Sequence, residues 1–329
     1  AHKTFGTAFL GEAGMNTLDI RPLTDEHPFG ARIGGVTRDN AADEDVRQKL
    51  RDVFWDRGMI VFEDIEQSED MQFALSDVFG PPQVYAIKGL SIDTGKRQGI
   101  INIGAREGEG TIVEFDGRRR AGHVPWHFDA CYVPKLNRAG VLRLVSNPPE
   151  GGMTGFADGV QMYQALSPEW QAKAASLSVI YYQYNMQQNQ RFGMPDDWQL
   201  IQLQEMAQTL SEASKDIPRS VHPAVWERKT GEKVLHVSPW QADGIAGQET
   251  SEGDALLEEL IQQMYAVMKP YWHDWKTTDM LIWDNWRFLH SAGGYDPQYG
   301  RDVRRTTIQG DYGLGCLLEE WKDRAAAPA

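Results

Sequence analysis

The sequence predicts one α+β domain built around a β-sandwich or a β-barrel. It contains many short strand-like runs separated by Gly and Pro turns. Its amphipathic helices gather in the first half of the chain and in insertions between strands. No internal repeat or low-complexity linker divides the 329 residues. Many short strands with turns between them are typical of sandwiches and barrels, and segregated helices are typical of the α+β class.

The composition is that of a soluble globular protein, with 41% hydrophobic and 24% charged residues. A formal net charge of -14 argues against nucleic acid and anionic membrane as partners, because both would be repelled. Two cysteines, Cys131 and Cys316, are too few for a disulfide framework. The start of the chain has no signal-peptide pattern, and no apolar run approaches the roughly 18–20 residues that span a bilayer. We therefore expect a cytoplasmic protein that acts on a small molecule.

The first third of the chain alternates helices and strands. In chain order the patterns predict a loose arm at 1–16, a strand near 18–20, a helix at 43–57, a strand at 59–62 and a helix at 69–79. Gly58 ends the first helix, and Ser68 caps the second. The segment 86–122 is interrupted by eight glycines and carries the basic run 118–120. It is either a solvated loop with a charged tip or a lid over the active site, since long loops in compact domains are often functional.

In the rest of the chain the patterns predict strands with helices inserted between them. The patterns predict strands at 141–145, 154–157, 178–184, 280–283 and 305–308, helices at 158–166, 168–175 and 255–268, and a hairpin of 222–226 with 234–237. Ser167 followed by Pro168 is a typical helix start. A Gly turn at 229–232 connects the two hairpin strands. The polar segment 195–217 predicts a helical insertion packed on the outside.

The candidate chemistry begins at Trp126-His127-Phe128-Asp129. Side chains two residues apart lie on one face of a strand, so His127 and Asp129 would project together. An imidazole and a carboxylate are two thirds of a facial site for Fe(II). Of the eight histidines, His290 is the best third ligand, because it follows a buried-looking strand and precedes the Gly293-Gly294 turn. On spacing alone, a structural hydrogen-bonded His–Asp pair remains the alternative.

Further motifs follow in order along the chain. They are Pro148-Pro149-Glu150-Gly151-Gly152-Met153-Thr154, then Ala165-Leu166-Ser167-Pro168-Glu169, then Asp279-Met280-Leu281-Ile282-Trp283-Asp284-Asn285, then Arg301 and Arg305, eleven and fifteen residues after His290. With the His127 motif, they resemble the TauD/TfdA-like family of Fe(II)- and 2-oxoglutarate-dependent dioxygenases. The likeness covers roughly residues 17 to 312.

The resemblance implies a single oxygenase domain, 1–329, with a double-stranded β-helix (jelly-roll) core and flanking helices. It implies Fe(II) on His127, Asp129 and His290, which leaves three positions for a bidentate 2-oxo acid and O2. By the same analogy Arg301 would pair with the distal carboxylate of 2-oxoglutarate, and Thr154 would donate its hydroxyl to it. A guanidinium offers a planar fork that matches a carboxylate.

The implied reaction is oxidative decarboxylation of 2-oxoglutarate to succinate and CO2, with hydroxylation or desaturation of a second, small substrate. Halogenating relatives usually have Ala or Gly where this chain has Asp129, so the carboxylate favours oxygen chemistry. These relatives are commonly dimers or tetramers, so we also expect a homo-oligomer.

Five residues are candidates for substrate contacts. The candidates are Arg305 for a substrate anion, His123 as a polar contact, and Phe128, Trp240 and Trp286 as an apolar wall. Arg305 could instead support a buried carboxylate, His123 could be a loop hydrogen-bonder, and the aromatic residues could be core. Trp286 departs from the family, in which an Arg commonly follows Asp-Asn. Arg287 is thereby displaced by one residue, which puts the ion pair usual near the Asp284-Asn285 motif of the family in doubt.

Two other functions fit part of the pattern. A non-catalytic jelly-roll protein could bind a metal or a small ligand, but it would not need Arg301 and Thr154 to clamp a dicarboxylate. A zinc hydrolase fits less well, because the site has three open positions and no obvious general base.

Overall fold

The computed structural model describes residues 18–83, 97–184, 186–311 and 313–327. The predicted arm at 1–16 lies outside these residues, as do 86–96 of the predicted lid. In the part of the chain that is described, no helix is both long enough and apolar enough to cross a membrane.

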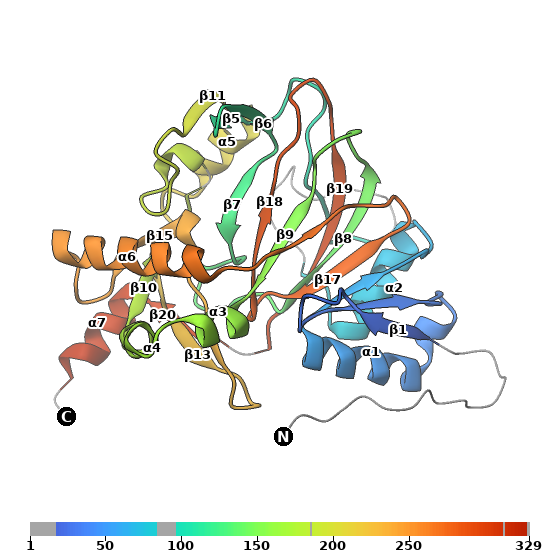
Figure 1. Cartoon of the computed structure of the whole chain (residues 1–329), viewed down its shortest axis with the longest axis horizontal. Coiled ribbons are helices and arrows are strands. Elements are labelled where there is room, and N and C mark those ends of the chain that lie inside the picture. The colour runs from blue at the N-terminus through green and yellow to red at the C-terminus, as the bar shows by residue number, and fades with distance from the viewer. Residues whose placement is uncertain (1–17, 84–96, 185, 312, 328–329) are drawn as a thin grey trace.

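Two β-sheets form the core, and consecutive strands pass from one sheet to the other (Figure 1). The larger sheet runs, in spatial order, β1 (Asp19–Pro22), β2 (Ala31–Gly34), β3 (Met59–Phe62), β17 (Met280–Asp284), β8 (Ala139–Ser146), β19 (Asp302–Ile308) and β4 (Ile100–Asn102). The smaller sheet runs β16 (Tyr271–His273), β9 (Thr154–Asp158), β18 (Phe288–Ala292) and β7 (Val124–His127). Along the chain, β7, β8 and β9 alternate between the sheets, and so do β16 to β19. This is the jelly-roll pattern, so the predicted α+β fold with a jelly-roll core is confirmed.

Two N-terminal helices cover the outer face of the larger sheet. They are α1 (Glu44–Arg57) and α2 (Glu69–Phe79). Asp43 caps α1 by accepting from two backbone N–H groups, and Gly58 ends it at a φ of 77°. Leu50 of α1 and Leu75 of α2 pack into one apolar cluster with the strands beneath them. A short 3-10 helix, Asn40–Ala42, precedes α1.

A long insertion between β9 and β16 covers the outer face of the smaller sheet. It contains α3 (Gly159–Ala165), α4 (Pro168–Ala175), α5 (Glu205–Ala213), α6 (Ser251–Val267), the strands β10 (Ser178–Tyr181), β12 (Ser220–Pro223) and β15 (Ala242–Ile245), the hairpin β13 (Val225–Glu227) and β14 (Lys233–Leu235), and the 3-10 helices Gln187–Asn189 and Pro239–Gln241. Near the C-terminus, β20 (Cys316–Leu317) joins the sheet of β10, β12 and β15, and α7 (Leu318–Ala326) follows. Apolar residues of α6 pack against Ala157 of β9 and Leu289 of β18, which closes this side of the core.

The segments predicted as a helical insertion and as a lid are partly strands. Within 195–217, only α5 is helical, and β11 (Gln199–Gln202) pairs with β5 (Ile112–Phe115). β5 in turn pairs with β6 (Arg118–Ala121). The run Gln199-Leu200-Ile201-Gln202 does not alternate polar and apolar residues, so it could not be recognised as a strand without its partner. Whether the segment 86–122 closes over a site stays a prediction.

Candidate metal centre

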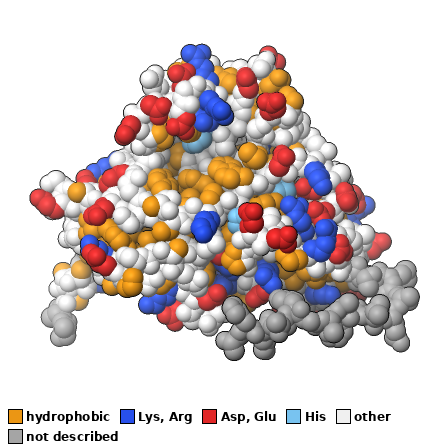
Figure 2. Space-filling view, viewed as in Figure 1, with side chains coloured by type: hydrophobic (Ala, Val, Ile, Leu, Met, Phe, Trp, Pro, Cys, Tyr) orange, Lys and Arg blue, Asp and Glu red, His pale blue; other side chains and the backbone are white. Residues whose placement is uncertain are grey.

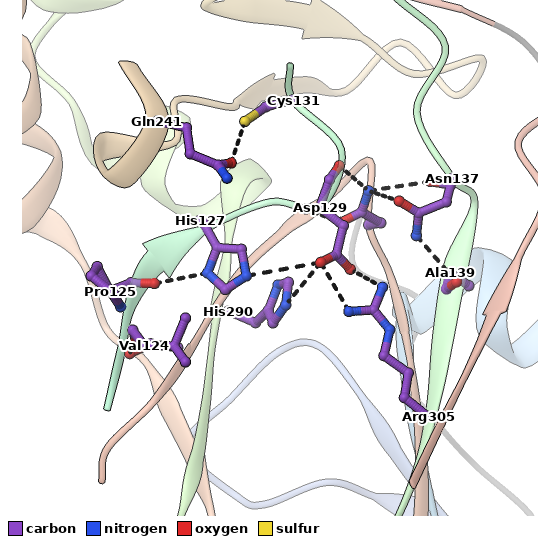
Figure 3. Close-up of polar contacts among 12 residues, drawn as sticks. Val124, Pro125, His127, Asp129, Cys131, Asn137, Ala139, Gln241, His290 and Arg305 are labelled. Atoms are coloured by element: carbon purple, nitrogen blue, oxygen red, sulfur yellow. Dashed lines mark hydrogen bonds and ion pairs between the residues drawn. The ribbon is translucent and has the colours of Figure 1, made fainter. Parts of the chain in front are cut away.

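Three side chains suited to metal binding converge between the two sheets. His290 lies directly opposite His127 where β18 pairs with β7, and their ring centroids are 4.1 Å apart. Asp129 Oδ1 lies 3.8 Å from His127 Nε2 and 3.7 Å from His290 Nε2 (Figure 3). One ligand atom from each residue falls within 4.8 Å of the others. Two imidazoles and one carboxylate in this arrangement fit a facial Fe(II) site.

His127 and Asp129 belong to different local structures, a strand and the turn after it. β7 ends at His127, and Asp129 lies in the turn that follows, where Ala130 has a φ of 59°. This differs from the predicted single strand. His290 lies inside β18, a strand that its sequence did not reveal. The turn after β7 is what directs the carboxylate of Asp129 back toward the two imidazoles.

Asn285 holds this turn and was not predicted as a functional residue. Its Oδ1 accepts from the Asp129 backbone N–H at 2.8 Å, and its Nδ2 donates to the Asp129 carbonyl at 3.0 Å. Asn285 is fully buried at the end of β17. The sequence signal for Asn285 is its place in the motif from Asp279 to Asn285 that carries the family resemblance.

The environment keeps the three ligands in their metal-binding protonation states. Burial lowers the pKa of both His127 and His290, even though Asp129 favours their charged forms. The His127 Nδ1 lies 2.7 Å from the Pro125 carbonyl oxygen, so Nδ1 carries the proton and Nε2 keeps its lone pair. Burial alone would raise the pKa of Asp129, but Arg305 and the two imidazoles outweigh it and hold that pKa well below its usual range.

Arg305 lies against the ligand carboxylate. Its Nη1 donates to Asp129 Oδ1 at 3.0 Å, and its Nη2 contacts Oδ2. The guanidinium also lies over the Trp283 ring, 5.3 Å from the centroid. The structure therefore pairs Arg305 with a buried carboxylate, which was the alternative to a direct substrate contact.

Arg301 and Thr154 meet beside the metal ligands. Arg301, which directly precedes β19, places Nη2 at 3.4 Å from the Thr154 hydroxyl oxygen at the start of β9. In the described part of the chain no carboxylate pairs with Arg301, and its buried Nε has no hydrogen-bond partner. Burial lowers the pKa of this guanidinium to about 10. A buried cation with unused donors is costly, so this corner fits an incoming carboxylate.

Of the four remaining substrate candidates, Trp240 lies beside the metal ligands, Phe128 and Trp286 lie in the core, and His123 lies at an outer groove. The Trp240 ring lies edge-on to His127, with centroids 5.1 Å apart, as a wall of the site would. Phe128 instead stacks on His236 at 3.8 Å in the core, because alternation along the chain turns it away from His127. Trp286 is fully buried in the same core. Both positions differ from the predicted substrate contact.

His123 lies at a groove on the outer side of the smaller sheet. There Trp126 and Trp272 pack edge to face over Gly155, and the groove encloses about 390 Å³. Hydrophobic side chains gather in this hollow (Figure 2). Burial, followed by the charge of Arg120, lowers the pKa of His123 to about 4.

The ion pair that Trp286 had put in doubt is present. Arg287 donates from Nε and Nη2 to the two carboxylate oxygens of Asp158, at 2.8 and 2.7 Å. Its Nη1 also donates to the Asp56 carbonyl at 2.9 Å. Arg287 therefore forms a buried ion pair despite its displacement by one residue.

Comparison with known proteins agrees with this geometry. Residues 19–307 match the model of the TauD, TfdA family of taurine catabolism dioxygenases. The chain is 27% identical to the (S)-phenoxypropionate/alpha-ketoglutarate-dioxygenase of Sphingobium herbicidovorans, over 89% of this chain and 96% of that protein. It is 26% identical to the alpha-ketoglutarate-dependent 2,4-dichlorophenoxyacetate dioxygenase of Cupriavidus pinatubonensis, over 87% and 96% of the two chains.

Two solved structures share the fold. A taurine dioxygenase from Burkholderia xenovorans superposes with a TM-score of 0.66 at 23% identity, covering 91% of this chain and 92% of that one. AAD-2, solved with Mn(II) and N-oxalylglycine, superposes with a TM-score of 0.67 at 22% identity, covering 91% and 100%. The chain therefore belongs to the TauD/TfdA family, and it is a dioxygenase that uses Fe(II), O2 and 2-oxoglutarate (alpha-ketoglutarate).

Proposed function

We propose that this dioxygenase hydroxylates or desaturates a small anionic substrate, most simply a carboxylate, while 2-oxoglutarate is converted to succinate and CO2. The observation that carries the proposal is the charge at the metal centre. Arg301 and Arg305 are both buried there; within the residues that the structure describes, Asp129 pairs with Arg305 and no carboxylate pairs with Arg301. An anionic substrate would supply the charge that this arrangement lacks.

In this proposal each polar residue has a separate task. His127, Asp129 and His290 hold Fe(II), which supplies the oxidising chemistry when O2 and 2-oxoglutarate are bound. Arg301 and Thr154 hold the distal carboxylate of 2-oxoglutarate. The 3.4 Å separation of the two side chains and the unused donors of Arg301 support this role. Arg305 keeps Asp129 ionised and aimed at the metal.

The charge balance favours an anion over a neutral substrate. The metal dication and the dianionic 2-oxoglutarate cancel each other. The two arginines and Asp129 then leave one positive charge in a buried site. Uncompensated buried charge is unfavourable, so a monoanionic substrate is stabilised relative to its neutral analogue.

The names of several relatives and the position of the Trp240 ring support the same class of substrate, an anion. Phenoxypropionate and 2,4-dichlorophenoxyacetate, named for two relatives, are carboxylates that carry an aromatic ring. Another relative is named a sulfate ester dioxygenase. In this chain the Trp240 ring beside His127 offers an aromatic face to such a substrate.

The test compares matched pairs of candidate substrates. Phenoxypropionate, phenoxyacetate and short alkyl sulfates are supplied with Fe(II), 2-oxoglutarate and O2, each beside an uncharged amide or alcohol of the same skeleton. We expect at least one anion to stimulate succinate release well above its neutral partner. Neutral analogues that stimulate succinate release as strongly as the anions would contradict the proposal.

A further inference from the structure

The hydroxyl of Thr154 receives two hydrogen bonds inside the core. The indole Nε1 of Trp275 donates to Thr154 Oγ1 at 2.9 Å, and Arg301 Nη2 approaches the same oxygen at 3.4 Å. Trp275 is buried just after β16, and none of the sequence motifs singled it out. The two donors reach the oxygen from different strands.

A hydroxyl oxygen has two acceptor positions and one hydrogen to donate. When two N–H groups occupy both acceptor positions, the O–H must point to a third group. We propose that Trp275 is a positioning residue, whose indole N–H orients the Thr154 hydroxyl so that its hydrogen is donated to the distal carboxylate of 2-oxoglutarate. The inference rests on the proposed role of Thr154 in binding that carboxylate.

The indole is itself held in place by a buried polar cluster. His273 lies opposite Thr154 where β16 pairs with β9, and its ring is edge-on to Trp275 with centroids 4.6 Å apart. The Tyr271 hydroxyl lies 3.0 Å from His273 Nδ1, and Asp279 Oδ2 lies 3.3 Å from Nε2. The ring of His273 is therefore confined on both sides, and it confines Trp275.

This cluster continues to the N-terminal strands. Arg32 of β2 donates from Nη2 to the Tyr271 hydroxyl at 3.0 Å and from Nη1 to Glu63 at 2.8 Å. The contact to Thr154 thus stands at the end of a chain of interactions anchored in the larger sheet. Such support is expected of a group that must be rigid before its ligand arrives.

The experiment measures the dissociation constant of 2-oxoglutarate by anaerobic titration of the Fe(II)-loaded enzyme. Trp275→Phe removes the N–H and keeps an aromatic ring. Loss of one neutral hydrogen bond should weaken 2-oxoglutarate binding by about three- to tenfold, with Fe(II) affinity unchanged. Trp272→Phe is the matched control, because Trp272 lies in the adjoining strand and is exposed on the outer face. It should bind 2-oxoglutarate as the wild type does.

A double-mutant cycle separates this inference from the proposed role of Thr154. If Trp275 acts through the hydroxyl, Trp275→Phe should have no further effect in a Thr154→Val background, whereas Thr154→Ser should retain the sensitivity. Unchanged affinity in Trp275→Phe, or an equal loss in both backgrounds, would overturn the role of Trp275 alone. Unchanged affinity in Thr154→Val would overturn the role of Thr154, and the inference with it.

A measurement on the wild-type fold covers the case in which Trp275→Phe does not fold. Indole N–H resonances can be followed by nuclear magnetic resonance in the Zn(II)-loaded enzyme. One indole resonance should move on adding 2-oxoglutarate and should also be displaced in Thr154→Val. If no indole resonance responds to both changes, the inference is wrong.

Discussion

Asn285 binds both backbone groups of Asp129 although 156 residues separate them: its amide accepts from the Asp129 N–H at 2.8 Å and donates to the Asp129 carbonyl at 3.0 Å. Asn285 directly follows β17 of the larger sheet, and Asp129 follows β7 of the smaller sheet. One side chain thus ties the two sheets together at the metal ligands. His236 supports it, with Nε2 at 2.9 Å from the Asn285 carbonyl oxygen.

Asn285→Ala should therefore damage the metal site more than the fold. Without the amide, the turn that aims Asp129 is free to relax, and loss of such a supporting contact typically weakens metal binding about 10- to 100-fold. Anaerobic Fe(II) titration measures the effect. The control is Asn102→Ala at an exposed position of β4, which should bind iron normally. Wild-type iron affinity in Asn285→Ala would show that Asp129 is positioned without this contact.

Gly152 is expected to be essential for the corner that holds Arg301. Its φ is 69°, and a Cβ there would lie 2.7 Å from Asn147 Oδ1 and 3.3 Å from Arg301 Nε. Gly152→Ala should lose about 1–3 kcal/mol of unfolding free energy and weaken 2-oxoglutarate binding.

Gly231 provides the matched control for that substitution. It has a φ of 84°, and a Cβ would meet nothing within 4 Å. Gly231→Ala should show the effect of backbone strain alone. Denaturant unfolding should give a smaller loss of unfolding free energy than in Gly152→Ala, and 2-oxoglutarate affinity should be unchanged. Equal effects of the two substitutions would mean that crowding at Gly152 has no consequence.

Arg301→Ala should abolish tight binding of 2-oxoglutarate and spare iron. The buried guanidinium has no carboxylate partner among the residues that the structure describes, so the co-substrate is its expected counter-ion. Removing one partner of a buried charge pair costs about 2–5 kcal/mol, or roughly 30-fold to several thousandfold in affinity. Separate titrations of Fe(II) and 2-oxoglutarate distinguish the two sites, and parallel loss of both would make Arg301 a structural residue.

Stability should fall on acidification because several histidines are buried in neutral form, His222 and His236 among them. Burial lowers the pKa of His222 to about 4 and that of His236 to about 3, from an ordinary value of 6.5. At pH values between the folded-state pKa of each histidine and 6.5, the unfolded chain binds more protons than the folded chain. The free energy of unfolding therefore decreases as pH falls below about 6.5. Between pH 7 and pH 5, each of these two histidines contributes on the order of 2 kcal/mol to this loss.

Urea unfolding at pH 7 and at pH 5 measures that loss. His222→Asn removes one of these titrating groups, and it should show a shallower decline with pH than the wild type. An identical decline in both proteins would mean that His222 takes no part in the acid sensitivity.

Much of the fold could be predicted because local signals mark its elements. The helical spacing that ends at Gly58 and the Ser68 cap place α1 and α2 within a residue of their observed ends. Strands buried on both faces, such as β3 and β17, read as short apolar runs. β11 and β18 were missed, because both depend on neighbouring strands for their pairing.

The metal ligands could be predicted from motifs, whereas their surroundings could not. His127, Asp129 and His290 lie together as expected. Which aromatic ring faces the metal depends on strand twist and on the turn after β7, so Phe128 and Trp286 could not be separated from Trp240 by sequence. The predicted site contacts with ligands, the cytoplasmic location and the homo-oligomeric state stay predictions.

The most direct test is the anaerobic absorption spectrum of the protein with Fe(II) and 2-oxoglutarate. A bidentate 2-oxo acid on an Fe(II) held by His127, Asp129 and His290 should give a weak visible metal-to-ligand charge-transfer band. The band should be absent in His127→Ala under the same conditions. A wild-type protein that binds Fe(II) and shows no such band, or a His127→Ala variant that keeps it, would contradict the assignment of this centre.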